Sequence, residues 1–169
     1  MSQQVRDQRW LTASEVQRLI QKLDGRKLSR GMLQHYAREA YVRPRLVTSR
    51  SGEQGRPSTT GYTLVDVVLL RWLMRLADEG VSLNRFADGI AALRKKMPEA
   101  LDAPDELRFL VVGRRDIAVQ TRDNRRIQLT GGTSGQVLLT FSTVPLVRDT
   151  LRSAEKLIEA RTRIAATGA

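Results

Sequence analysis

The residues of this chain with the most evident binding chemistry lie in one short segment, SRGMLQHYAR, at positions 29–38. Arg30, Gln34 and Arg38 follow one another at intervals of four, so a helix would carry them on one face with His35 beside them. Arginine pairs with guanine or holds a phosphate, and glutamine pairs with adenine. For His35, the only histidine, contact with nucleic acid and a plain surface position are both open. Ser29 is a candidate N-cap, and a helix that begins there presents N–H groups to phosphate.

The composition argues against most catalytic chemistry. The 169 residues include no cysteine and one histidine, so the chain lacks thiolate nucleophiles, disulfides and the usual ligands of zinc. Carboxylate pairs such as Asp78–Glu79 fall at expected helix ends or in linkers, where exposed acids are ordinary. We therefore expect no enzymatic activity, no metal and no cofactor.

Basic residues are concentrated at one end of the sequence. The 29 lysines and arginines outnumber the 18 acidic residues, and the pI is about 11.1. Residues 1–60 hold 12 basic and 5 acidic residues, whereas residues 61–100 hold 6 and 5, and residues 101–169 hold 11 and 8. An arginine-rich genome would raise arginine throughout, so this asymmetry indicates a localised surface for nucleic acid.

Two short helices are expected within the first forty residues. Thr12 and Glu15 form a capping box, and the helix that follows should end at Asp24–Gly25. Ser29 opens a second helix that runs to about Glu39. Two helices joined by a tight turn are the outline of a helix-turn-helix motif.

A β-hairpin is expected next. Pro44 and Pro57 forbid a continuous helix, and the apolar residues near position 46 favour a strand. Residues 49–61 are rich in serine, glycine and threonine and would form a long tip. Arginines beside such a hairpin would contact a neighbouring duplex; they are Arg43, Arg45, Arg50 and Arg56.

The remaining pattern predicts an α+β chain. An apolar helix should cover 64–77, and Ser82 should cap another helix over 83–96. After a linker at 98–104, strands are expected at 107–112, 116–121, 126–129 and 136–141, followed by a helix after Pro145. We expect a DNA-binding domain of four helices and a hairpin at 1–97, and a β-rich domain with a C-terminal helix at 105–169.

The first half of the chain resembles the MerR family of winged helix-turn-helix proteins. The residues that carry the resemblance lie in the segments LTASEVQRL (11–19), LSRGMLQHYAREAYVRP (28–44) and GYTLVDVVLLRWLMRLADEGVSLNRF (61–86). It implies a homodimer whose second helix enters the major groove of double-stranded DNA while its wings grip the flanking phosphates. The operator would be an inverted repeat.

The resemblance also assigns two tyrosines and has two departures. It implies a phosphate contact for Tyr36, although Tyr36 is equally suited to pack in the core, and it places Tyr62, at the end of the wing, among the DNA-binding residues. Gln34 and Thr63 stand where family members often carry arginine. The β-rich segment replaces the family's long dimerisation helix, so the effector stays unassigned.

Our leading prediction is a transcriptional regulator that binds DNA in the bacterial cytoplasm, associated with the nucleoid. No run of residues is apolar enough for a membrane span, and the first ten residues lack the apolar core of a signal peptide. Two alternatives stay open. One is an antitoxin-like protein that binds a protein partner through residues 105–169 and represses its own operon. The other is an architectural protein that bends DNA.

Overall fold

The structure is a computed structural model that describes residues 10–47, 59–102, 107–112, 116–121, 123, 126–128 and 137–167. Helices and strands are mixed in this part of the chain, which is compatible with the expected α+β class. The chain divides into two compact units. The first unit contains the described residues up to Val67 and those from Asp149 onward, and the second contains Val68–Arg148.

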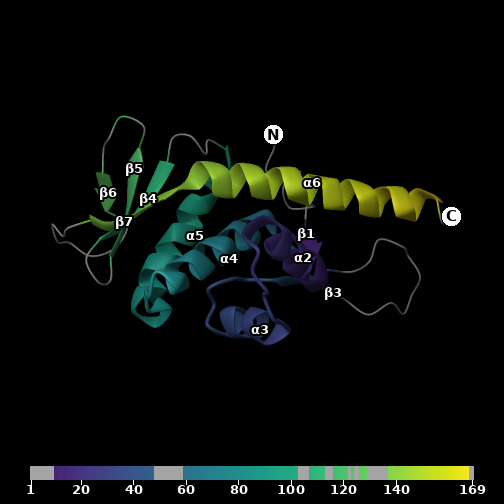
Figure 1. Cartoon of the computed structure of the whole chain (residues 1–169), viewed down its shortest axis with the longest axis horizontal. Coiled ribbons are helices and arrows are strands. Elements are labelled where there is room, and N and C mark those ends of the chain that lie inside the picture. The colour runs from purple at the N-terminus through teal and green to yellow at the C-terminus, as the bar shows by residue number, and fades with distance from the viewer. Residues whose placement is uncertain are drawn as a thin grey trace. The chain divides into compact units, whose positions relative to one another are not determined.

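The first unit begins with a short strand and two helices. Strand β1 (Trp10–Thr12) leads into α2 (Ala13–Asp24), and α3 (Arg30–Arg38) follows after a turn (Figure 1). The expected capping box is present, and Gly25 ends α2 in the left-handed conformation with φ +67°. Glycine adopts this conformation without the strain that a Cβ would cause. The Gln17 side chain donates to the Leu28 carbonyl oxygen at 2.8 Å, which ties α2 to the turn before α3.

The apolar faces of α2 and α3 supply the core of this unit. The buried side chains lie at helical spacing on both helices: Val16, Leu19 and Ile20 on α2, and Leu33 and Tyr36 on α3. Helix α3 ends with Ala40 in the left-handed region at φ 55°, where the Tyr41 N–H donates to the Tyr36 carbonyl oxygen at 2.9 Å.

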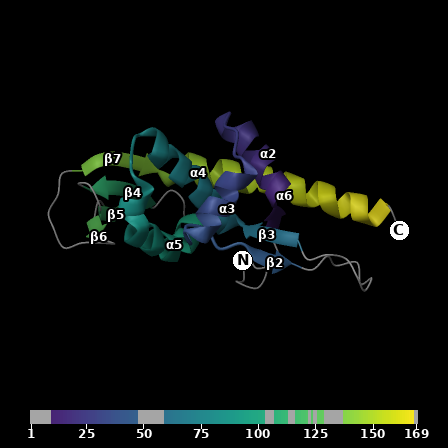
Figure 2. The ribbon, with the colours of Figure 1, turned by 90° about the horizontal axis from the view of Figure 1, so that it is seen from below.

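A three-stranded antiparallel sheet completes the N-terminal part. Strands β2 (Arg45–Val47) and β3 (Thr59–Thr63) lie side by side, and β1 pairs with the other edge of β3 (Figure 2). In the register, Leu11 faces Tyr62 and Leu46 faces Thr60. The sequence did not predict β1, because three residues are too few to show an alternating pattern. The expected hairpin tip at 49–61 is shorter in the structure, because residues 59–61 belong to β3, where they pair with β2; residues 49–58 lie outside the described residues.

Helices dominate the first part of the second unit. Helix α4 (Leu64–Asp78) passes from the first unit into the second and ends before Gly80, whose φ is +75°. A 3₁₀ turn (Leu83–Phe86) precedes α5 (Ala87–Asp102). Ser82 was expected to cap a helix directly, but its side chain makes no capping hydrogen bond.

Helix α5 also runs past the expected end near Lys96. It continues through Pro98 to Asp102, so the first five positions of the expected linker are helical. Proline removes one backbone hydrogen bond but does not forbid a helix that packing supports. Leu93 and Met97 are buried four residues apart on this helix, so its apolar face continues past the expected end.

Four further strands and a long helix follow. Strands β4 (Leu107–Val112), β5 (Asp116–Thr121), β6 (Arg126–Gln128) and β7 (Val137–Ser142) pair antiparallel in the order β6-β5-β4-β7. Strand β7 leads directly into α6 (Thr143–Thr167), which accommodates Pro145 in its first turn. Residues of α6 up to Arg148 belong to the second unit, and the later ones belong to the first.

Candidate nucleic-acid interface

Helix α3 presents a basic and polar face to solvent. Arg30, Gln34 and Arg38 are exposed at intervals of four residues, and His35 is exposed next to them. On the opposite face Leu33 is 1 % exposed and Tyr36 is 5 % exposed. The helix is therefore held by its apolar side, and the four residues that the sequence singled out share the side that a ligand can reach.

The start of α3 is fixed by Ser29. Its Oγ accepts a hydrogen bond from the Met32 N–H at 3.1 Å, which confirms the expected N-cap. A serine hydroxyl can accept this bond and still donate its own hydrogen. Lys27 is also exposed, in the turn just before Ser29, and adds a basic group that the sequence analysis did not single out.

The last turn of α3 contains three charged or ionisable side chains within reach of one another. Arg38 Nη2 lies 3.4 Å from His35 Nδ1, and Arg38 Nε lies 3.6 Å from Glu39 Oε1. His35 Nδ1 lies 3.9 Å from the same Glu39 oxygen. All three side chains are at least 39 % exposed, so these contacts are weak and a stronger anion can displace Glu39.

Tyr36 and Tyr62 are buried instead of lying on this surface. Tyr36 packs with its ring centre 6.1 Å from that of Tyr41, and Tyr62 is 4 % exposed. Burial raises the pKa of Tyr36, Tyr41 adds to the rise, and the charge of Arg26 opposes it. Burial also raises the pKa of Tyr62, and the charge of Asp66 raises it further. For Tyr36, the structure favours the interpretation as a core residue, and Tyr62 takes the same role.

A second capping box connects the hairpin to α4. The Asp66 N–H donates to Thr63 Oγ1 at 3.2 Å, while Asp66 Oδ2 accepts from the Thr63 N–H at 3.0 Å and from its hydroxyl at 2.7 Å. Asp66 Oδ1 also accepts from the Arg43 N–H at 3.0 Å. Asp66 is 2 % exposed, so this carboxylate fixes the backbone on both sides of the hairpin.

Two of the four hairpin arginines lie in the described part of the chain. Arg43 and Arg45 are exposed, and Arg43 is anchored through its main chain by Asp66. Arg50 and Arg56 lie outside the described residues. The sequence analysis did not single out Asp66. Its signal is nevertheless present, since Thr63 and Asp66 have the threonine-x-x-aspartate spacing of a capping box.

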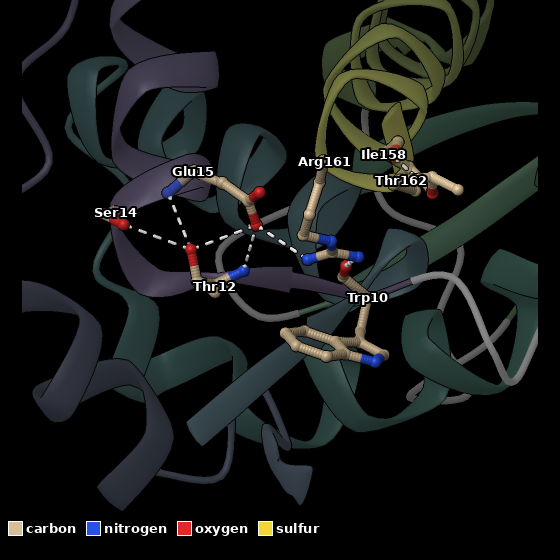
Figure 3. A network of polar contacts seen from close by, with 7 residues as sticks. All are labelled: Trp10, Thr12, Ser14, Glu15, Ile158, Arg161 and Thr162. Carbon is tan, nitrogen blue, oxygen red and sulfur yellow. Dashed lines mark hydrogen bonds and ion pairs between the residues drawn. The ribbon is translucent and has the colours of Figure 1, made fainter. Parts of the chain in front are cut away.

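The end of α6 is joined to the start of α2 by one arginine. Arg161 Nη1 donates to Glu15 Oε2 at 3.2 Å, and Nη2 donates to the Trp10 carbonyl oxygen at 3.1 Å. The guanidinium carbon lies 4.4 Å from the centre of the Trp10 ring (Figure 3). The same Glu15 oxygen accepts from the Thr12 N–H at 2.7 Å. We call these four residues the Arg161 latch; all of them belong to the first unit.

Comparison of the chain with models of known protein families and with curated proteins found no match. In the described part of the chain, no helix is long and apolar enough to cross a membrane. Among the same residues, no three histidine, aspartate or glutamate side chains are grouped as a metal site would require.

Proposed function

We propose that this chain is a sequence-specific DNA-binding transcriptional regulator that acts as a homodimer on an inverted-repeat operator. In this proposal α2 and α3 form a helix-turn-helix, α3 enters the major groove, and β2 and β3 form a wing beside it. The observation that carries the proposal is the exposed face of α3, where Arg30, Gln34 and Arg38 lie opposite buried Leu33 and Tyr36. The homodimer and the inverted repeat rest on the resemblance to the MerR family.

The charge distribution supports the same partner. The net charge of the whole chain is +11, and the excess is concentrated in residues 1–60, which include α3 and β2. A side chain that neutralises a phosphate releases counterions, so each such contact adds about 0.9 to the slope of log affinity against log salt. Arg30, Arg38, Arg43 and Arg45 are the exposed candidates.

Sequence readout would come from the centre of α3. Gln34 has the donor and acceptor that pair with adenine, and Arg30 has the fork that pairs with guanine. The two side chains are one turn apart on the exposed face. Tyr36 and Tyr62 would act by holding α3 and the wing in place, because their rings are buried.

The test is fluorescence anisotropy of the full-length protein on a random duplex and on the duplex upstream of its own gene, over a range of salt concentrations. We expect tighter binding to the upstream duplex, with a difference that survives added salt. The double variant Arg30→Ala/Arg38→Ala should weaken binding and reduce the salt slope by about 2 if both residues contact phosphate. The variant Arg108→Ala/Arg152→Ala removes the same charge from exposed positions elsewhere and serves as the control.

Two results would overturn the proposal. Equal, salt-sensitive binding to both duplexes would favour the architectural alternative. No binding to either would leave the basic surface without a duplex partner and turn the search to a protein that binds residues 105–169.

A further inference from the structure

Helix α3 contains a glycine for which the described part of the chain offers no structural reason. Gly31 lies in the first turn of α3 and is exposed. It is not among the residues that have positive φ in the described part of the chain, which are Gly25, Gly80 and Ala40. A Cβ added to Gly31 would meet Ser29 Oγ at 3.8 Å, an ordinary van der Waals distance. An alanine at this position would therefore clash with none of the described residues.

Glycine has a cost at such a position. It has a lower helix propensity than alanine, because its backbone loses more freedom when the helix forms. At Gly25 this loss is offset, because the residue ends α2 with φ +67°, a conformation that glycine adopts without strain. Gly31, in contrast, has an ordinary helical conformation. A glycine at this position would be useful if the surface of a binding partner approached the backbone of α3 closely, because glycine has no side chain to keep that surface away.

The neighbours of Gly31 indicate what this surface is. Arg30 precedes it, and Gln34 and His35 lie one turn further along the same exposed face. A basic and amide-bearing surround fits a polyanion that also carries hydrogen-bonding edges, as the major groove of DNA does. An apolar partner would leave these polar groups without compensation.

We infer that Gly31 is the point of closest approach between α3 and the DNA duplex, where the missing Cβ lets the helix backbone move deeper into the groove. This inference rests on the proposed function and adds a steric determinant to it. Side chains at position 31 would hold the helix away from the bases and lengthen the contacts of Gln34 and Arg30.

The experiment compares Gly31→Ala and Gly31→Leu with the wild-type protein. The probes are a labelled duplex recovered by in vitro selection with the wild-type protein and a random duplex of the same length. Ala91→Leu places the same leucine side chain at an exposed position of α5 and is the control. Gly31→Ala should raise Tm by a few degrees and weaken binding to the selected duplex about tenfold, the effect of losing one base contact. Gly31→Leu should weaken it further, and Ala91→Leu should bind as wild type does.

The opposite movement of Tm and affinity separates this role from a folding defect. Wild-type affinity in both Gly31 variants would overturn the inference and leave the proposed function intact. Equal loss of affinity in Ala91→Leu would also overturn it. A wild-type protein from which selection recovers no duplex would overturn the proposed function and this inference together.

Discussion

The two capping boxes of the first unit use the same local motif in different surroundings. At the start of α2, Thr12 and Glu15 form a box whose carboxylate is partly exposed and receives Arg161 from a distant helix. At the start of α4, Thr63 and Asp66 form a box whose carboxylate is 2 % exposed and receives a main-chain N–H from Arg43. The first box therefore joins helices through a side chain, whereas the second fixes the backbone of the hairpin.

A capping motif formed by neighbouring residues can therefore also make contacts with residues that are distant in the sequence. Both boxes satisfy N–H groups that a helix start leaves unpaired. What each box does beyond that depends on the lone pairs left on its carboxylate and on the donor that packing brings to them. Both carboxylates accept from the backbone N–H of their own threonine; the second donor is the Arg161 side chain for Glu15 and the Arg43 main chain for Asp66.

The largest effect should come from breaking the buried box. Asp66→Ala removes the acceptor of the Arg43 and Thr63 N–H groups and of the Thr63 hydroxyl. Because the Asp66 carboxylate is 2 % exposed and its hydrogen bonds are only partly buried, we expect a loss of about 2–4 kcal/mol in the free energy of unfolding, measured by chemical denaturation. Asp66→Asn should lose less, since one amide oxygen still accepts. If Glu15→Ala costs as much as Asp66→Ala, the contrast between the two boxes is wrong.

A smaller effect should come from opening the Arg161 latch. Arg161→Ala removes two charge-assisted hydrogen bonds and the contact with the Trp10 ring, at a side chain that is 34 % exposed. We expect a loss of about 1–3 kcal/mol in the free energy of unfolding and a change in Trp10 fluorescence. Arg161→Lys keeps the charge but not the planar fork, so it should recover only part of the loss.

A double-mutant cycle of Glu15→Gln with Arg161→Ala measures the pair itself. Coupling between the two substitutions supports the latch, because Glu15→Gln removes the negative charge with which Arg161 pairs. Strictly additive losses would mean that Arg161 acts through Trp10 alone.

The smallest effect concerns the pH dependence of stability. The carboxylate of the second box contributes to it through a neighbouring tyrosine. The chain has three tyrosines, and burial is the first cause of a raised pKa in each; for Tyr62 the charge of Asp66 is the second. Below pH 10.0, the ordinary pKa of tyrosine, these side chains are protonated in both the folded and the unfolded chain. In this range the buried tyrosines make their full contribution to the free energy of unfolding. Above it the unfolded chain ionises first, and the free energy of unfolding should fall with rising pH.

Tyrosinate absorbance and denaturation at alkaline pH check this prediction. In Asp66→Asn the pKa of Tyr62 should move toward 10.0, since one cause of its rise is removed while burial remains. Tyr36 should keep its raised pKa in this variant, because Asp66 does not contribute to its shift. Stability that does not change above that pH would contradict the assignment of these tyrosines to the core.

The features that the sequence predicted correctly are local. The Thr12–Glu15 box, the glycine end of α2 and the Ser29 cap each involve residues at most four positions apart. Partners in the latch are 146 residues apart, and Asp66 is 23 residues from Arg43. No periodicity carries such pairings, because they arise only when the elements pack. Tyr62 illustrates the same limit, since its burial depends on β1, a strand too short to predict.

The candidate surface was predictable for a related reason. Arg30, Gln34 and Arg38 share a face because helical spacing places them there, and Leu33 and Tyr36 are buried by the same periodicity. Anchoring of the Arg43 backbone was not predictable, since it depends on Asp66 in another element.

The discontinuous make-up of the first unit has a consequence for biosynthesis. Arg161 leaves the ribosome 146 residues after Glu15, which at ordinary rates of elongation is an interval of about 7–30 s. During this interval Trp10 and Glu15 are present without the arginine that covers them. The helices α2 and α3 therefore emerge well before the later part of α6, and their unit gains the support of Arg161 only after the intervening residues have been translated.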